Sequence, residues 1–199
     1  MEIDKLEYID ECHYYLWDGV IIPSVSDLLR YIFPDKYRHI PEPILKAKAQ
    51  FGTNIHEAIE RFEKGLEISL TDIEEVVFAQ YLKLKVRHKI KVLEQEKMVC
   101  YKGRYAGRLD MIAEVNGRRF LIDIKTTAKF DGVSVMWQLS FYQMAYGEKF
   151  DGLACIWLPK NDIGRFVELN EVPEVQLYNE LERYDRYVRG LEDEDNCNG

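Results

Sequence analysis

Two aspartates and a lysine near the middle of the chain have the spacing that metal-assisted hydrolysis requires. Asn116-Gly117 separates two apolar runs, and both residues tolerate the positive φ angles of a two-residue type I′ turn. Counting outward from that turn predicts that Asp110 faces Asp123 as a non-hydrogen-bonded pair, with Cα atoms roughly 4.5 Å apart. Lys125 follows two residues later in the same strand and points the same way.

Two carboxylates that face each other at this distance repel, so we expect a cation to compensate them. Oxygen ligands suit Mg²⁺ or Mn²⁺, either of which polarises a phosphoryl oxygen and lowers the pKa of a bound water. Lys125 can orient that water or stabilise the charge that develops in the transition state. The alternative is an edge of solvated charges without function. Because like-charge pairs on a ladder are normally avoided, the pattern favours a hydrolytic metal site.

The two faces of the predicted hairpin differ in polarity, and this difference also supports a site on one face. Near the turn, Glu114 faces Arg119 as an ordinary cross-strand ion pair. One face is expected to form a continuous core surface from Leu109, Met111, Ala113, Val115, Phe120, Ile122 and Ile124. The other face carries Asp110, Ile112, Glu114, Arg119, Leu121, Asp123 and Lys125.

The elements that must position these residues follow from apolar periodicity and from cap and turn signals. We expect a small hairpin, Tyr14–Trp17 and Val20–Ile22, around Asp18-Gly19, and then a short helix that Ser24 or Ser26 caps and that ends before Pro34. The further helices are expected over Pro43–Lys64, Thr71–Lys91, Ser134–Tyr146 and Pro173–Gly190. The further strands are expected over Lys97–Tyr101, Tyr105–Val115, Arg118–Lys125, Leu153–Leu158 and Ile163–Leu169. This order predicts an α/β fold with a mixed central β-sheet flanked by helices.

The composition is that of one globular domain, since 47% of the 199 residues are hydrophobic and no apolar run is long enough for a membrane span. The acidic N-terminus does not resemble a signal peptide, so we expect a soluble cytoplasmic protein of a bacterial or phage-infected cell that has no membrane partner. None of the four cysteines forms a C-x-x-C pair. We therefore expect free thiols and neither zinc nor an iron–sulfur cluster.

The charge is unevenly distributed along the chain. The total is −8, but residues 1–29 carry −6, residues 30–130 carry +6 and residues 131–199 carry −8. The basic middle can attract phosphates while both ends repel them. The alternative is that this asymmetry only serves solubility.

At these residues the sequence resembles the PD-(D/E)xK nuclease superfamily. Asp110 and Asp123-Ile124-Lys125 match the two halves of its motif, and Gly107-Arg108-Leu109-Asp110 is similar to its G-x-x-D. Gly52-Thr53-Asn54-Ile55-His56 resembles the G-T-x-x-H of the RecB-like branch, and Gln138-Leu-Ser-Phe-Tyr142 resembles its Q-x-x-x-Y. Glu96 resembles an acidic position in the preceding strand, although Glu94 would share its face.

The resemblance implies a restriction-endonuclease-like core over residues 1–190, followed by an acidic, disordered tail over 191–199. It implies that His56, Asp110, Asp123 and the Ile124 carbonyl bind Mg²⁺ or Mn²⁺, and that Asp110, Asp123, Lys125 and Glu96 are catalytic. Gln138, Tyr142 and Arg108 are the implied nucleic-acid contacts. Gly52, one turn before His56, is expected to leave room for close approach. Taken alone, His56 would be a half-buried helix residue and Gln138–Tyr142 part of an amphipathic core helix.

The chain resembles the phage recombination exonucleases and the mitochondrial single-strand exonuclease, which lack an iron–sulfur cluster. The expected function is therefore a metal-dependent DNA exonuclease in recombination, repair or phage DNA processing, acting on single strands or DNA ends, with a recombination protein as partner. The alternatives are a structure-specific endonuclease and a non-catalytic DNA-binding module that retains the fold. A non-catalytic member should have lost a metal carboxylate or the lysine, and Asp110, Asp123 and Lys125 are all present.

Overall fold

The computed structural model describes residues 5–10, 14–36, 38 and 40–190. The expected disordered tail, 191–199, lies outside the described residues. The elements in chain order are β1 (Leu6–Ile9), β2 (Tyr14–Trp17), β3 (Val20–Ile22), α1 (Val25–Ile32), α2 (Glu42–Glu63), α3 (Asp72–His88), β4 (Ile90–Tyr101), β5 (Tyr105–Val115), β6 (Arg118–Lys125), α4 (Gly132–Tyr146), β7 (Gly152–Trp157), β8 (Arg165–Leu169) and α5 (Glu174–Val188).

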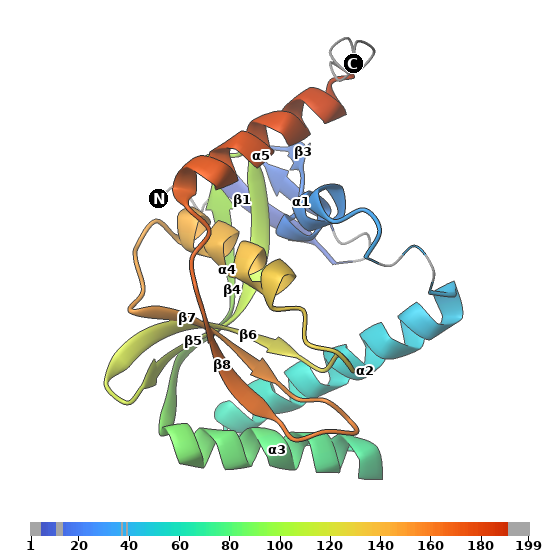
Figure 1. Ribbon diagram of the computed structural model, residues 1–199, viewed down its shortest axis with the longest axis vertical. Coiled ribbons are helices and arrows are strands. Elements are labelled where there is room, and N and C mark those ends of the chain that lie inside the picture. The colour runs from blue at the N-terminus through green and yellow to red at the C-terminus, as the bar shows by residue number, and fades with distance from the viewer. Residues whose placement is uncertain (1–4, 11–13, 37, 39, 191–199) are drawn as a thin grey trace.

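A five-stranded sheet in the order β4-β5-β6-β7-β8 forms the centre of the molecule. Only β6 and β7 pair in parallel, through the crossover helix α4, and the other neighbours are antiparallel. Helices α2 and α3 cover one face of the sheet, whereas α1, α4 and α5 cover the other (Figure 1). The predicted fold class, a mixed sheet flanked by helices, is therefore confirmed. No described helix has the length and apolar character to cross a membrane.

The turn between β5 and β6 has the predicted geometry, because Asn116 and Gly117 have φ angles of 51° and 79°. Paired residues run from Val115↔Arg118 to Met111↔Ile122. One further pair would set Asp110 against Asp123, but the ladder ends before it. The Ile124 N–H instead donates to the Asp110 carboxylate at 2.7 Å. The prediction that the two aspartates form a regular cross-strand pair is therefore wrong, since a side chain takes a backbone donor there.

The strict alternation of faces also breaks at Asp110. Met111 packs in the core cluster beneath α2 and α3, as predicted, but Leu109 packs in the cluster on the opposite face. On β4 the matching irregularity is Glu96, whose φ of 49° is left-handed and costly for a residue with a side chain. Neighbouring pairs Gln95↔Met111 and Lys97↔Leu109 are present on either side of these two residues. The sheet is thus irregular where the carboxylates meet.

The predicted boundaries differ most between α3 and β4. A capping box of Thr71 and Glu74 opens α3 at the predicted start, but the helix ends at His88 and does not reach Lys91. Lys89 adopts the left-handed conformation, which stops the helix, and Ile90 then turns into the core. Strand β4 consequently begins seven residues before the predicted Lys97.

A second sheet, β1-β2-β3, lies at the N-terminal end of the described chain. The predicted hairpin of β2 and β3 is present, with φ angles of 52° at Asp18 and 77° at Gly19, whereas β1 was not predicted. This sheet packs against the ends of β4 and β5 through one small core cluster: Leu6, Tyr15, Ile22, Cys100 and Ala106.

Candidate metal centre

Three side chains from three elements converge at the sheet irregularity. His56 comes from α2, Glu96 from β4 and Asp110 from β5, and each offers one ligand atom within 4.8 Å of the other two. All three side chains are partly exposed, so the group is open to solvent. One imidazole and two carboxylates are a donor set that suits Mn²⁺ or Mg²⁺. The described residues thus fit a divalent metal at this position.

His56 joins the helix to both strands of the hairpin. Its Nε2–H donates to the Ile124 carbonyl at 2.9 Å, and its Nδ1 lies 3.7 Å from Asp110 Oδ1. The buried neighbours Ile55 and Ile59 hold α2 against the sheet, which directs the imidazole to the carboxylates. Because Nε2 carries the proton, Nδ1 keeps the lone pair that could coordinate a metal beside Asp110.

No neighbouring group in the described structure lies so close to Gly52 that only glycine would fit there. A Cβ at this position would lie 3.4 Å from Thr126 Oγ1, which is ordinary van der Waals contact. The expectation that this glycine leaves room for a close neighbour has no counterpart in the packing of α2.

Asp123 lies in a different environment from the three clustered ligands. Its side chain is 1% exposed, and the Lys125 ammonium donates to Oδ1 at 2.7 Å. On the other side, Cys155 Sγ of β7 lies 3.9 Å from Oδ2. The structure therefore brings Asp123 to Lys125, while Asp110 joins His56 and Glu96. Cys155 had no sequence signal, because it enters through the parallel pairing of β6 with β7.

The electrostatics of the centre favour the binding of a cation. Burial, and then the charge of Asp110, raise the pKa of Glu96 to about 7. Burial likewise raises the pKa of Asp123 to about 6, although Lys125 opposes this effect. Burial lowers the pKa of Lys125, but Asp123 and Asp110 more than compensate and leave it raised. Lys125 is therefore an ammonium at neutral pH. Its single positive charge does not balance the carboxylates of Glu96, Asp110 and Asp123.

Without metal, the free energy of unfolding should fall as the pH rises from about 5 to about 7. The folded protein holds a proton on Glu96, with its pKa near 7, that the unfolded chain releases around its ordinary value of 4.5. The native state then binds more protons than the unfolded state, so stability decreases through this window. The raised pKa of Asp123 acts in the same direction. Denaturant unfolding in EDTA across this pH range measures the slope, and Glu96→Gln should make it shallower; an unchanged slope would contradict this assignment.

The two acidic residues of β4 separate clearly in space. The Glu94 carboxylate accepts hydrogen bonds from the Lys97 ammonium and from the Tyr146 hydroxyl. These bonds hold Glu94 in a surface network. Glu96 belongs to the metal cluster. The geometry therefore favours Glu96 over Glu94 as the acidic residue of the site.

Gln138 and Tyr142 lie side by side on α4, beneath the aspartates. Burial, and then the charge of Asp110, raise the pKa of Tyr142, while a hydrogen bond from Gln138 lowers it. The Tyr142 ring lies so close to Gly107 that a Cβ there would be 2.5 Å from Cε1. The side chain of Tyr142 is only 5% exposed, so it has little surface for DNA. Its burial suits a role in supporting Asp110.

Arg108 lies at the rim of the centre. Its Nη1 is 3.8 Å from Glu96 Oε2, and its guanidinium carbon is 4.7 Å from the centre of the Tyr8 ring. Burial raises the pKa of Tyr15 to about 12, and the charge of the nearby Arg108 opposes this effect. The two tyrosines come from the N-terminal sheet, and nothing in the sequence pattern linked them to Arg108.

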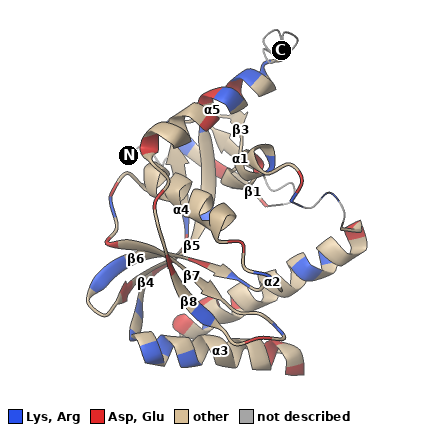
Figure 2. Ribbon diagram, viewed as in Figure 1, with Lys and Arg blue, Asp and Glu red and all other residues tan. Residues whose placement is uncertain are grey.

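The basic middle of the chain does not form one uniform surface. Figure 2 shows Lys and Arg mixed with Asp and Glu along α2 and α5, whereas on α3 the acidic residues lie in the first turn and the basic residues toward the last turn. Several cations of residues 30–130 are paired with carboxylates: Lys46 with Glu42, Lys85 with Glu63, Lys97 with Glu94, Arg104 with Asp185, and Arg119 with Glu148. Carboxylates therefore offset much of the positive charge of this segment.

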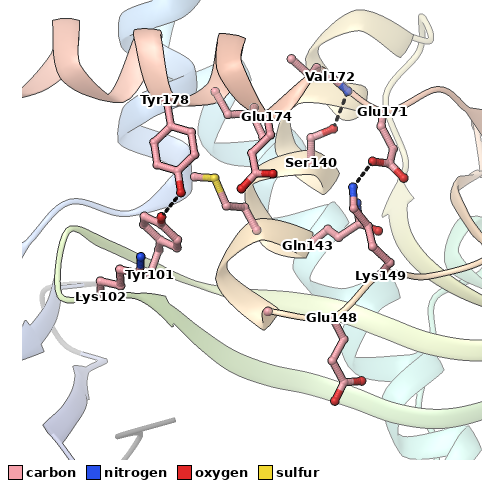
Figure 3. Close-up of a pocket in the computed structure, with 13 residues that line it drawn as sticks. Tyr101, Lys102, Ser140, Gln143, Glu148, Lys149, Glu171, Val172, Glu174 and Tyr178 are labelled. Atoms are coloured by element: carbon pink, nitrogen blue, oxygen red, sulfur yellow. Dashed lines mark hydrogen bonds and ion pairs between the residues drawn. The ribbon is translucent and has the colours of Figure 1, made fainter.

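A pocket of about 310 Å³ lies between α4, α5 and the β4 end of the sheet (Figure 3). None of its lining residues belongs to the metal centre. Two polar groups that line it are engaged in packing, because Ser140 accepts from the Val172 N–H and Gln143 accepts from the Phe150 N–H. Lys149 and Glu171 pair at its edge. This pocket results from the packing of α5 against α4 and the sheet, and it is separate from the metal centre.

Comparison with known proteins gives one family. The PD-(D/E)XK nuclease superfamily matches over residues 28–193. No curated protein matches the chain significantly. Among solved structures, the chain is similar to SSO0001, at 16% identity and a TM-score of 0.48, over 83% of this chain and 74% of that one. It is also similar to an alkaline exonuclease (LHK-Exo) from Laribacter hongkongensis, at 10% identity and a TM-score of 0.43, over 69% of this chain and 79% of that one.

Proposed function

The chain belongs to the PD-(D/E)XK nuclease superfamily, and on that basis we propose that it is a DNA exonuclease that depends on Mg²⁺ or Mn²⁺. The observation that supports this most is the convergence of His56, Glu96 and Asp110 within 4.8 Å, beside the Asp123–Lys125 pair. A nuclease that had lost its activity would be expected to lack part of this set. The proposal places the chain in recombination, repair or phage DNA processing.

In this proposal His56, Asp110, Asp123 and the Ile124 carbonyl hold the metal, as expected from the sequence, and Glu96 joins them. When bound, the ion supplies Lewis-acid polarisation of a phosphoryl oxygen and a more acidic water. Asp123 completes the site through its buried carboxylate, which fixes the Lys125 ammonium at 2.7 Å. Burial, and then the charge of the nearby Asp110, raise the pKa of Tyr142, and Gln138 remains a proposed contact to the nucleic acid.

Lys125 has the properties of an electrostatic catalyst. Its raised pKa means that it does not accept a proton at neutral pH, so it is unsuited to act as a general base. A fixed ammonium can donate hydrogen bonds to the attacking water or to a phosphoryl oxygen. Because Asp123 orients it before the substrate arrives, little reorganisation is needed during the reaction.

Replacing His56 with alanine should raise the Mn²⁺ concentration needed for half-maximal cleavage by roughly ten-fold or more. The reason is the loss of an imidazole that touches both Asp110 and the Ile124 carbonyl. Cleavage rates over a Mn²⁺ titration measure the shift. His88→Ala is the matched control, since His88 also lies on a helix but stacks on Phe166. An unchanged metal dependence with a slightly lower melting temperature would make His56 a structural residue only.

Digestion of end-labelled DNA tests the proposed exonuclease directly. Linear and circular substrates, single- and double-stranded, are incubated with Mg²⁺ or Mn²⁺. An exonuclease degrades linear strands from their ends and leaves circles intact. Cleavage of circles would favour the structure-specific endonuclease, and an absence of cleavage on every substrate would favour the non-catalytic DNA-binding module.

A further inference from the structure

The N-terminal sheet is an addition to the matched superfamily region that nevertheless reaches the metal centre. Strands β1–β3 span Leu6 to Ile22, whereas the superfamily match begins at residue 28. The sheet shares a core cluster with β4 and β5, the strands that carry Glu96 and Asp110. It is therefore packed against the part of the molecule that shapes the site.

Arg108 is the residue through which this sheet contacts the centre. It lies on β5 two residues before Asp110, and its guanidinium lies over the Tyr8 ring of β1. Burial raises the pKa of Tyr15 of β2, Arg108 lies close enough for its charge to oppose this effect, and the Tyr8 and Tyr15 rings are themselves 4.9 Å apart. Stacking on an aromatic ring restricts the orientation of the guanidinium plane. The two tyrosines thus fix the direction in which Arg108 presents its N–H groups.

The contact between Arg108 and Glu96 is loose enough to be exchanged for a substrate. At 3.8 Å it is longer than a direct hydrogen bond, and the Arg108 side chain remains 37% exposed. A metal held by Glu96 would compete with Arg108 for this carboxylate. The guanidinium fork matches a phosphate in geometry and charge. A phosphate beside the metal centre is therefore the natural partner of Arg108 once a DNA strand is bound.

We propose that the N-terminal sheet is part of the substrate-binding site, where Tyr8 and Tyr15 orient Arg108 onto the phosphate next to the scissile one. This inference rests on the proposed nuclease function and specifies how that site holds its strand. Arg108 contacts the backbone of the DNA and not its bases, so the contact is independent of sequence. Tyr8 and Tyr15 are positioning residues that act through Arg108.

A series of oligonucleotides, each with one neutral methylphosphonate near the cleaved end, locates this contact. Dissociation constants are measured with Ca²⁺ in place of the working metal. For wild type, one substitution next to the scissile position should weaken binding by roughly ten-fold, the order of one charge-assisted contact. Arg108→Met should lose the same affinity and become insensitive to that one substitution while remaining sensitive to the others.

The role of the sheet is tested in the same assay by changing Tyr8. Tyr8→Leu should lose most of the coupling between Arg108 and the single phosphate, whereas Tyr8→Phe, which keeps the ring, should retain it. A merely structural effect would weaken binding to every oligonucleotide equally. Thermal unfolding shows whether each variant folds. If Tyr8→Leu does not fold, Tyr8→Thr replaces it. A loss of coupling in Tyr8→Thr supports the role of the ring, and unchanged coupling contradicts it.

Two results would overturn the inference. If Arg108→Met stays as sensitive as wild type to every methylphosphonate, Arg108 is not the phosphate contact. If the coupling survives in Tyr8→Leu, the N-terminal sheet does not orient it. Cleavage of linear and circular DNA by wild type with Mn²⁺, measured in parallel, separates these results from failure of the proposed function, in which circles are cleaved or no DNA is cleaved.

Discussion

Asp110→Ala should abolish metal-dependent DNA cleavage, with a loss of at least about a thousand-fold in the single-turnover rate. The ion contributes several kcal/mol of transition-state stabilisation, and each 1.36 kcal/mol is about ten-fold in rate. Asp110 is central to the cluster, because Oδ1 faces His56 while Oδ2 accepts the Ile124 N–H. The variant should therefore lose both metal affinity and turnover.

Two further substitutions make this prediction specific. Asp110→Asn keeps an oxygen that can accept from Ile124, so it should preserve the local backbone while still losing activity. Glu114→Ala is the matched control, since Glu114 lies on the same strand and faces Arg119 near the turn. Rates and calorimetric Mn²⁺ titrations should be unchanged in the control. Cleavage at the wild-type rate by pure Asp110→Ala protein would mean that this carboxylate does not hold the metal.

Lys125→Met should reduce turnover by roughly a hundred- to a thousand-fold while leaving metal binding intact. The side chain keeps its length but loses the charge that Asp123 fixes. Because Asp123 is buried, its carboxylate loses its compensating charge, so the variant should also unfold at a lower temperature. Mn²⁺ calorimetry and single-turnover rates separate the two effects.

Lys97→Met controls for the loss of an ion-paired lysine, because Lys97 pairs with Glu94 within β4 of the same sheet. It should cleave DNA at close to the wild-type rate. If Lys125→Met loses metal affinity together with turnover, the lysine contributes to the metal centre itself and the role proposed for it is wrong.

The hairpin that carries the motif could be predicted from the sequence because its signals are local. Asn116-Gly117 defines the turn, and strands β5 and β6 have the predicted bounds. The apolar residues near the turn alternate as expected, so Met111, Ala113 and Ile122 share one core cluster. Where regular pairing holds, residue spacing alone determines which side chains share a face.

The details of the site could not be predicted, since they depend on departures from regular pairing. The left-handed φ of Glu96 and the bond from Ile124 N–H to Asp110 interrupt regular pairing at the point where the carboxylates meet. An alternation rule therefore placed Leu109 on the wrong face. The first half of β4 is rich in Lys and Glu, which conceals a strand. The contacts of Arg108 with β1 and β2 join segments about a hundred residues apart.

The central claim is that these residues form a metal-dependent nuclease centre, and one measurement tests it most directly. Hydrolysis of labelled linear DNA is followed in Mn²⁺, in Mg²⁺ and in EDTA, with wild type and Asp110→Asn purified in parallel. The account predicts cleavage by wild type with metal, none in EDTA, and none by Asp110→Asn under any condition. Cleavage that persists in EDTA, or equal cleavage by both proteins, would contradict it.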